Sequence, residues 1–150
     1  LFLAYSLANV PGIDNVLLLI GETLSKLTSA NDKSTGLLLG DGGSATLINK
    51  NEKYGESYFS LNTDGESYKS VIVPGGGFRN MSSKETLTEK VDEEGNTRND
   101  EQLMMDGLDV FSFAVSKIPK DVKNLLEFAN MDLSNIDKLV FHQSRMLENV

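Results

Sequence analysis

The sequence predicts a mixed α/β fold, and three stretches support that prediction. Residues 15–22 form a continuous apolar run that ends in glycine and an acid, as expected for a central strand covered on both faces. Residues 139–141 form a second short apolar run that leads directly into His142. Residues 102–126 repeat apolar side chains at intervals of three to five, which is typical of an amphipathic helix.

The composition limits the class of protein. The chain has 150 residues, of which 39% are hydrophobic and 24% charged, as in a single globular domain with a sizeable core. The net charge of -8 argues against duplex DNA or an anionic membrane surface as the main partner. Without cysteine, the chain has no disulfide, no thiolate metal site and no cysteine nucleophile of its own. We therefore expect no nucleic-acid partner, no membrane partner and no metal.

The first elements are predicted from breakers and apolar runs. Residues 1–10 resemble the tail of a buried helix, and Pro11-Gly12 ends it. The strand of residues 15–22 follows. Its terminal Glu22 is either a site residue or a helix-capping group, and capping is the favoured interpretation. No apolar run is long enough to span a bilayer, and residues 1–8 lack the basic region of a signal peptide.

Glycines dominate the next stretch. After a polar loop at 28–35, residues 36–48 are interpreted as a strand, a glycine turn and a second strand. Backbone amides in such a turn can hold a phosphate, but no lysine and no helix pattern follow the glycines. We therefore expect residues 40–45 to form a close-packed turn, without phosphate, near a dimer interface or the floor of an active site.

The middle of the chain alternates short strands with polar connections. Residues 57–62 and 70–73 are predicted strands, the second of which ends at Pro74-Gly75-Gly76-Gly77. Residues 84–101 are rich in charge and poor in apolar side chains. Because such a stretch can bury little, we expect a solvent-exposed excursion.

The helix of residues 102–129 contains Pro119, which either kinks it or opens a second helix. A turn at 132–137 then leads to the strand before His142, the single histidine. A single histidine in a chain is more often a packed or exposed residue without a functional role than a functional residue. However, ligands of α/β sheets bind at the carboxyl ends of strands, and imidazole titrates near neutral pH. We therefore expect His142 to face a cleft.

Six motifs in order resemble the β-ketoacyl-acyl-carrier-protein synthase III family of condensing enzymes. One such motif would be weak evidence, but six in the family's order are specific. They cover most of the chain and lie at residues 16–22, 31–35, 40–45, 73–77, 105–115 and 141–143.

The resemblance implies the thiolase-like α/β/α/β/α sandwich, present here as an incomplete, internal piece. Residues 1–48 would be the end of the N-terminal half and residues 49–150 the start of the C-terminal half. It also implies a cytoplasmic homodimer that uses acyl-CoA and acyl carrier protein, with no cofactor.

The family's chemistry is implied in the same way. A cysteine at a helix N-terminus takes an acyl group from acyl-CoA, and a histidine and an asparagine assist decarboxylation of malonyl-acyl-carrier protein. His142 matches that histidine. The cysteine would lie before Leu1 and the asparagine beyond Val150, so residues 1–150 alone are expected to be inactive.

Two basic residues are expected near the substrate. Lys33 matches a basic family position near the adenine end of CoA. Arg145 is the candidate for a contact to the CoA phosphates. The spacing is shorter than in the family at residues 8–14 and 143–146, where Arg145 lies.

Two alternative functions stay open, one of them enzymatic and the other not. One alternative is another thiolase-like enzyme, such as hydroxymethylglutaryl-CoA synthase. A second is a non-catalytic partner subunit that keeps the fold and lacks the nucleophile. A cysteine within about ten residues upstream of Leu1 in the gene would favour an enzyme, because the thiolate is the nucleophile.

Overall fold

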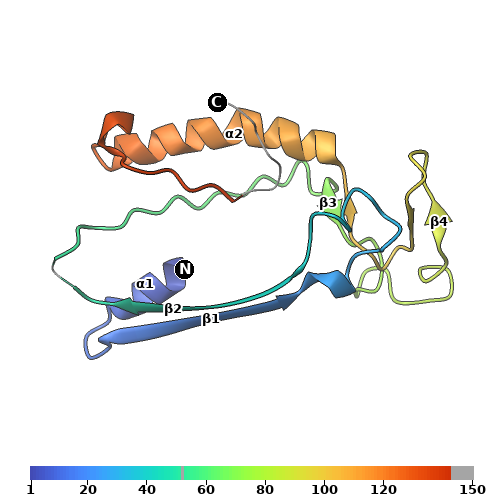
Figure 1. Cartoon of the computed structure of the whole chain (residues 1–150), viewed down its shortest axis with the longest axis horizontal. Helices are drawn as coiled ribbons and strands as arrows, with labels where there is room; N and C mark the ends of the chain where they lie inside the picture. The colour runs from blue at the N-terminus through green and yellow to red at the C-terminus, as the bar shows by residue number, and fades with distance from the viewer. Residues whose placement is uncertain (52, 143–150) are drawn as a thin grey trace.

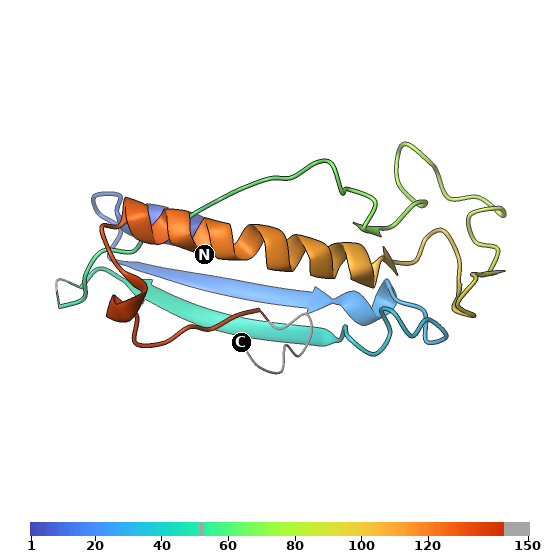
Figure 2. The ribbon, with the colours of Figure 1, turned by 90° about the horizontal axis from the view of Figure 1, so that it is seen from above.

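The structure is a computed structural model that describes residues 1–51 and 53–142. Two long, roughly parallel arms make up the molecule (Figure 1). One arm is an antiparallel ribbon of β1 (Asn15–Thr23) and β2 (Asp41–Asn49), and the other is the helix α2 (Gly107–Phe128). Loops and short strands at one end join the arms, and both views show α2 extended along the ribbon (Figures 1 and 2). The elements confirm the mixed α/β class.

The helix α1 (Phe2–Ala8) packs on one face of the ribbon, as predicted for the apolar N-terminal segment. Ala4 and Ala8 are buried against Ile48, with Val16 and Leu18 beside them. Alanine has the smallest side chain that helices favour, so the backbone of α1 can approach the strands closely.

The other face of β1 is open. The predicted strand at residues 15–22 is confirmed and continues to Thr23, but coverage on both faces is not observed. Leu17 and Leu19 alternate with the covered residues and remain 59% and 68% exposed. Within the described residues β1 pairs only with β2, and α1 covers only one face.

The predicted glycine turn at residues 40–45 is wrong. β2 begins at Asp41 and contains the glycines, with Gly43 opposite Gly21 and Gly42 opposite Glu22. Glycine is allowed in both turns and strands, and continuous pairing with β1 determines the outcome here. Residues 36–39, predicted as a strand, do not form one: residues 36–38 form turns, and Leu39 has no regular secondary structure. Glu22 is therefore inside a strand and does not cap a helix.

The connection between the arms runs along α2. The strand predicted at residues 57–62 does not form, because this segment pairs with no other strand of the described residues. Its trace runs below α2 in Figure 1. Side-chain contacts hold residues 58–70 to the helix, and their order is antiparallel to it. The contacts are Tyr58 with Phe128, Ser60 with Asp121, Asp64 with Lys117, and Ser70 with Asp109.

Two small antiparallel pairs lie at the end of the molecule where the arms meet. β3 (Val71–Ile72) confirms the predicted strand and pairs with β6 (Met104–Met105). β4 (Lys90–Val91) and β5 (Thr97–Arg98) form a hairpin within the charged excursion. Residues 84–95 are mostly exposed, as expected, but residues 96–101 are buried or half-buried. The charged excursion is therefore mostly exposed along residues 84–95 and packs against the rest of the molecule along residues 96–101.

α2 is one helix that includes Pro119, so no second helix starts there. It begins at Gly107 because the Asp106 carboxylate caps it, accepting hydrogen bonds from the amides of Leu108 and Asp109, each at 3.0 Å. Its apolar side chains are largely exposed, Phe111 at 39% and Val115 at 52%, so the expected packed face is not observed. None of the helices in the described residues has both the length and the apolar character needed to cross a membrane.

Candidate functional site

The loop that carries Lys33 is built around the buried Asp32. One carboxylate oxygen of Asp32 accepts hydrogen bonds from the backbone amide of Ser34 at 2.8 Å and from its hydroxyl at 2.6 Å. The other accepts from the Thr35 hydroxyl at 3.1 Å. The Asp32 carbonyl accepts from the Gly36 amide at 2.9 Å. Aspartate favours such turns because its short side chain reaches the backbone two residues on.

The β4–β5 hairpin has its own aspartate-centred turn. The Asp92 carboxylate accepts from the amides of Glu94 at 3.0 Å and Asn96 at 2.8 Å, and from the Asn96 side chain at 3.2 Å. Gly95 takes a φ of 81°, a conformation that favours glycine, and this lets the chain reverse. The turn places the Asn96 side chain toward the loop of residues 29–36.

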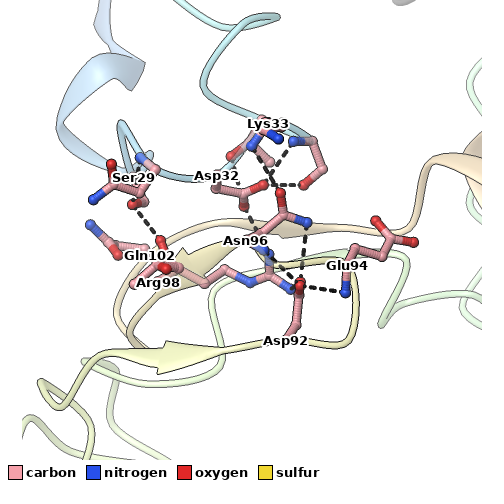
Figure 3. Close-up of polar contacts among 12 residues, drawn as sticks. Ser29, Asp32, Lys33, Asp92, Glu94, Asn96, Arg98 and Gln102 are labelled. Carbon is pink, nitrogen blue, oxygen red and sulfur yellow. Dashed lines mark hydrogen bonds and ion pairs between the residues drawn. The ribbon is translucent and has the colours of Figure 1, made fainter.

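Arg98 joins these two turns (Figure 3). One guanidinium nitrogen lies 3.0 Å from Asp32 Oδ2, and the other lies 2.8 Å from Asp92 Oδ2. The Asp32 side chain is fully buried and that of Arg98 is 14% exposed. We call Asp32, Asp92, Asn96 and Arg98 the Arg98 cluster. Arginine fits this position because its planar fork can bond two carboxylates at once.

The electrostatics of the Arg98 cluster favour charged carboxylates. Burial by itself would raise the pKa of Asp32, but hydrogen bonds from Ser34 and Thr35 and the Arg98 charge outweigh it, so the pKa lies below its ordinary value. The pKa of Asp92 is also lowered, mainly by the Asn96 amide and further by Arg98. Both aspartates are therefore ionised at neutral pH and neutralised locally by one arginine.

The hairpin segment also holds the glycine loop at residues 74–77. The Gly75 amide donates to the Asp100 carbonyl at 2.6 Å, and the Thr86 hydroxyl donates to Glu101 at 2.6 Å. Gly76 has a φ of 79° and packs on the Glu101 side chain. One polar segment thus fixes two loops that are distant in the sequence.

Lys33 lies on the outer side of this arrangement. Its backbone amide donates to Asn96 Oδ1 at 3.1 Å, and the residue is exposed. Its ammonium group forms no ion pair with a described residue. Because the backbone of Lys33 is held by Asn96 and its ammonium is unpaired among the described residues, Lys33 is suited to contact an anion.

His142 does not lie at the end of a strand. Residues 138–142 have no regular secondary structure, and Val140 and Phe141 are 83% and 63% exposed. The expectation of a buried strand is therefore wrong for this structure. A strand needs a neighbour to pair with, and none of the described strands lies in register with this segment.

His142 is exposed and lines neither of the two main hollows found among the described residues. The larger hollow, of about 820 Å³, lies beside α1 and β2 and is lined by Phe2, Tyr5 and Tyr58 among others. The expectation that His142 faces a cleft stays a prediction. Arg145 lies outside the described residues. The structure thus places Lys33 beside the Arg98 cluster.

No metal-binding group is found in the described part of the chain, in the sense of three or more clustered histidine, cysteine, aspartate or glutamate side chains. The Arg98 cluster itself was not predicted from the sequence. The signal that could have found it is the turn sequence Asp92-Glu93-Glu94-Gly95-Asn96, because aspartate, glycine and asparagine are typical turn residues.

Comparison with known proteins identifies the relatives of this chain. The family model for 3-oxoacyl-[acyl-carrier-protein (ACP)] synthase III matches residues 1–65. A putative 3-oxoacyl-[acyl-carrier-protein] synthase 3 of Campylobacter jejuni is 35% identical over 144 residues, which is 96% of this chain and 40% of that protein. The β-ketoacyl-[acyl-carrier-protein] synthase III of Fusobacterium nucleatum is 33% identical and is covered to 41%. The chain is a homologue of the synthase III proteins.

The solved structures of synthase III agree with this homology. A crystal structure of a 3-oxoacyl-(acyl-carrier-protein) synthase III matches with a TM-score of 0.81 and 36% identity, covering 91% of this chain and 41% of that one. A synthase from Burkholderia xenovorans matches with a TM-score of 0.70 and 31% identity. This synthase III homologue therefore has part of a thiolase-like fold, as predicted. The chain spans about 40% of the length of the curated relatives it matches.

Proposed function

We propose that this chain is part of an acyltransferase that condenses an acyl group from acyl-CoA with malonyl-acyl-carrier protein in fatty-acid or related biosynthesis. The observation that supports the proposal is the match to synthase III proteins along nearly all of the chain, at 35% identity in sequence and a TM-score of 0.81 in structure. The proposed partners are acyl carrier protein, acyl-CoA and a second copy of the chain.

His142 is proposed to donate an N–H to the thioester oxygen of the malonyl group. Negative charge develops on that oxygen as carbon dioxide leaves, and a fixed donor stabilises it most at that moment. The nucleophilic cysteine and the asparagine are proposed to lie outside residues 1–150. The cysteine would attack the acyl thioester and release the CoA thiol, and the enolate would then take the acyl group from the cysteine.

Lys33 is proposed to contact the phosphate at the adenine end of CoA, and Arg145 is proposed to contact the CoA phosphates. Lys33 suits this role because it is exposed and its ammonium has no ion-pair partner among the described residues. A lysine ammonium binds phosphate as a compact point charge.

The test is a pair of assays on the complete gene product: labelled acyl transfer from acyl-CoA to the protein, and carbon dioxide release from malonyl-acyl-carrier protein. His142→Ala should slow carbon dioxide release on the order of a hundred- to a thousand-fold, because one donor to the developing charge is lost. Acyl labelling should fall much less. His142→Asn keeps an N–H donor and should recover part of the rate.

Lys138→Gln is the matched control, since Lys138 is exposed four residues before His142. It should leave both assays unchanged. A His142→Ala protein that released carbon dioxide at the normal rate would contradict the role of His142. A complete gene product that neither takes up the acyl label nor releases carbon dioxide would contradict the proposed function and favour a non-catalytic subunit.

A further inference from the structure

The β4–β5 hairpin holds the loop of residues 29–36, which carries Lys33, through four contacts. The Ser29 hydroxyl donates to the Thr97 carbonyl at 2.6 Å, and the Thr97 amide donates to the Asn31 carbonyl at 3.1 Å. Arg98 pairs with Asp32, and Asn96 accepts from the Lys33 amide. Three successive hairpin residues, 96–98, therefore fix residues 29–33, which are more than sixty positions away in the sequence.

The hairpin residues that hold the loop are themselves fixed. Asn96 is buried, and Asp92 accepts hydrogen bonds from both its backbone and its side chain, which sets the direction of its Oδ1 atom. Arg98 is held between two carboxylates and is nearly buried. A loop gripped by such partners keeps one backbone conformation, whereas a free loop must be ordered when a ligand binds.

The charges are distributed so that Lys33 stays available. Arg98 neutralises Asp32, the neighbour of Lys33 in the sequence. It also neutralises Asp92, which holds the Asn96 side chain that binds the Lys33 amide. Neither carboxylate forms an ion pair with the Lys33 ammonium among the described residues. Arg98, which is largely buried, neutralises the buried Asp32 and the half-buried Asp92. The charge of the exposed Lys33 is therefore not needed to neutralise either aspartate.

We propose that Asn96 and Arg98 are positioning residues that hold Lys33 in place for the phosphate groups of a nucleotide-bearing substrate. This inference rests on the proposed function, in which that substrate is acyl-CoA. The hairpin acts through the loop: it does not touch the substrate, and its contribution is to remove the cost of ordering Lys33 when the phosphate binds.

The test uses the complete gene product and the variant Asn96→Ala, which removes the acceptor of the Lys33 amide. The KM for acyl-CoA should rise on the order of three- to tenfold, the effect expected from one lost hydrogen bond. The KM for malonyl-acyl-carrier protein and kcat should stay within about twofold. Combined with Lys33→Gln, the variant should be no worse than Lys33→Gln alone, because both changes remove the same contact.

Two measurements do not depend on turnover. Hydrogen exchange of the peptide spanning residues 29–36 should become faster in Asn96→Ala. Calorimetric binding of adenosine 3′,5′-bisphosphate should weaken by the same factor as the KM rises. Arg98→Lys, which keeps the positive charge, is the second variant and should lie between the wild type and Asn96→Ala in both measurements. Asn80→Ala is the matched control, since Asn80 donates to the Pro74 carbonyl in the other loop.

The results separate the possible failures. Faster exchange with unchanged bisphosphate affinity and unchanged KM would overturn the inference, because the hairpin would then be only structural. Additive losses in the double variant would overturn it as well. If no acyl labelling or carbon dioxide release is found in the wild type, the proposed function fails, while bisphosphate binding and exchange still show whether the hairpin positions Lys33.

Discussion

The Arg98 cluster and the β1–β2 ribbon are stabilised in opposite ways. The cluster is small, polar and closed: two carboxylates, an amide and a guanidinium satisfy one another within 3.2 Å. The ribbon is long and apolar, and one of its faces is open, with Leu17 and Leu47 paired across the strands and 59% and 64% exposed. We call the face that carries Leu17, Leu19 and Leu47 the open ribbon face.

The difference follows from the two kinds of interaction. A buried polar group needs a partner at hydrogen-bond distance, and none of the buried side-chain nitrogen and oxygen atoms in the described residues lacks one. An apolar side chain needs only area removed from water, and it contributes little until that area is covered. The cluster should therefore respond sharply to single substitutions, whereas the open ribbon face should not.

Arg98→Met is expected to have the largest effect on stability. It leaves the fully buried Asp32 carboxylate without its counter-charge, and breaking a buried ion pair from one side costs roughly 3–5 kcal/mol. Urea unfolding of the purified protein measures this loss. Lys123→Met is the control: it removes an exposed pair with Glu127 at 3.8 Å and should cost less than about 0.5 kcal/mol. Equal losses of unfolding free energy in the two variants would contradict the prediction that the buried Arg98–Asp32 pair matters more for stability than an exposed pair.

Acid should break the same cluster from the carboxylate side. The pKa of Asp32 is lower in the folded protein than its ordinary value of 3.8, so its contribution to stability is complete above that value. The contribution is lost as the pH falls through the lowered pKa, because the protonated carboxyl no longer balances Arg98. Unfolding measured between pH 7 and pH 2 should show this loss only below about pH 4. In Asp32→Asn that part of the pH dependence should be absent.

The sequence predicted the elements whose signal is local. The apolar run of residues 15–22, the N-terminal helix and the strand at Val71 lie where they were expected. The long helix lies within the predicted residues 102–129 but begins only at Gly107, because Met104 and Met105 pair with β3. The charge of residues 84–101 correctly indicated a segment that is mostly at the surface. In each case neighbouring residues alone determine the conformation or the exposure.

The errors concern features set by distant partners. Gly42 and Gly43 were expected in a turn, and pairing with β1 extends them instead. The apolar residues before His142 were expected to form a strand, but no described strand pairs with them. The Arg98 cluster depends on a contact between residues 66 positions apart, which no local pattern encodes. Lys33 was predicted through a family resemblance and stays a prediction as a substrate contact, whereas the hydrogen bond from its amide to Asn96 was not predicted.

Ile48 and Leu47 test the two faces of the ribbon directly. Ile48 is 9% exposed beneath α1, and the adjacent Leu47 is 64% exposed on the open ribbon face. Ile48→Ala should cost roughly 2–5 kcal/mol through lost burial and the cavity it leaves. Leu47→Ala should cost less than about 0.5 kcal/mol. Urea unfolding of the 150-residue chain compares them, and similar costs for both would mean that the open ribbon face is covered.

The smallest expected effect concerns the start of α2. The Asp106 carboxylate accepts two amide hydrogen bonds there, and replacing an aspartate cap by alanine costs about 1 kcal/mol. Asp106→Asn keeps an oxygen acceptor and should recover most of that loss. Glu127→Ala, near the other end of the helix, should be neutral or slightly stabilising, because a negative charge there opposes the helix dipole. Unfolding followed by circular dichroism separates the three variants. If Asp106→Ala matched Glu127→Ala, the helix would have to be held by its contacts with residues 58–70 rather than by its cap.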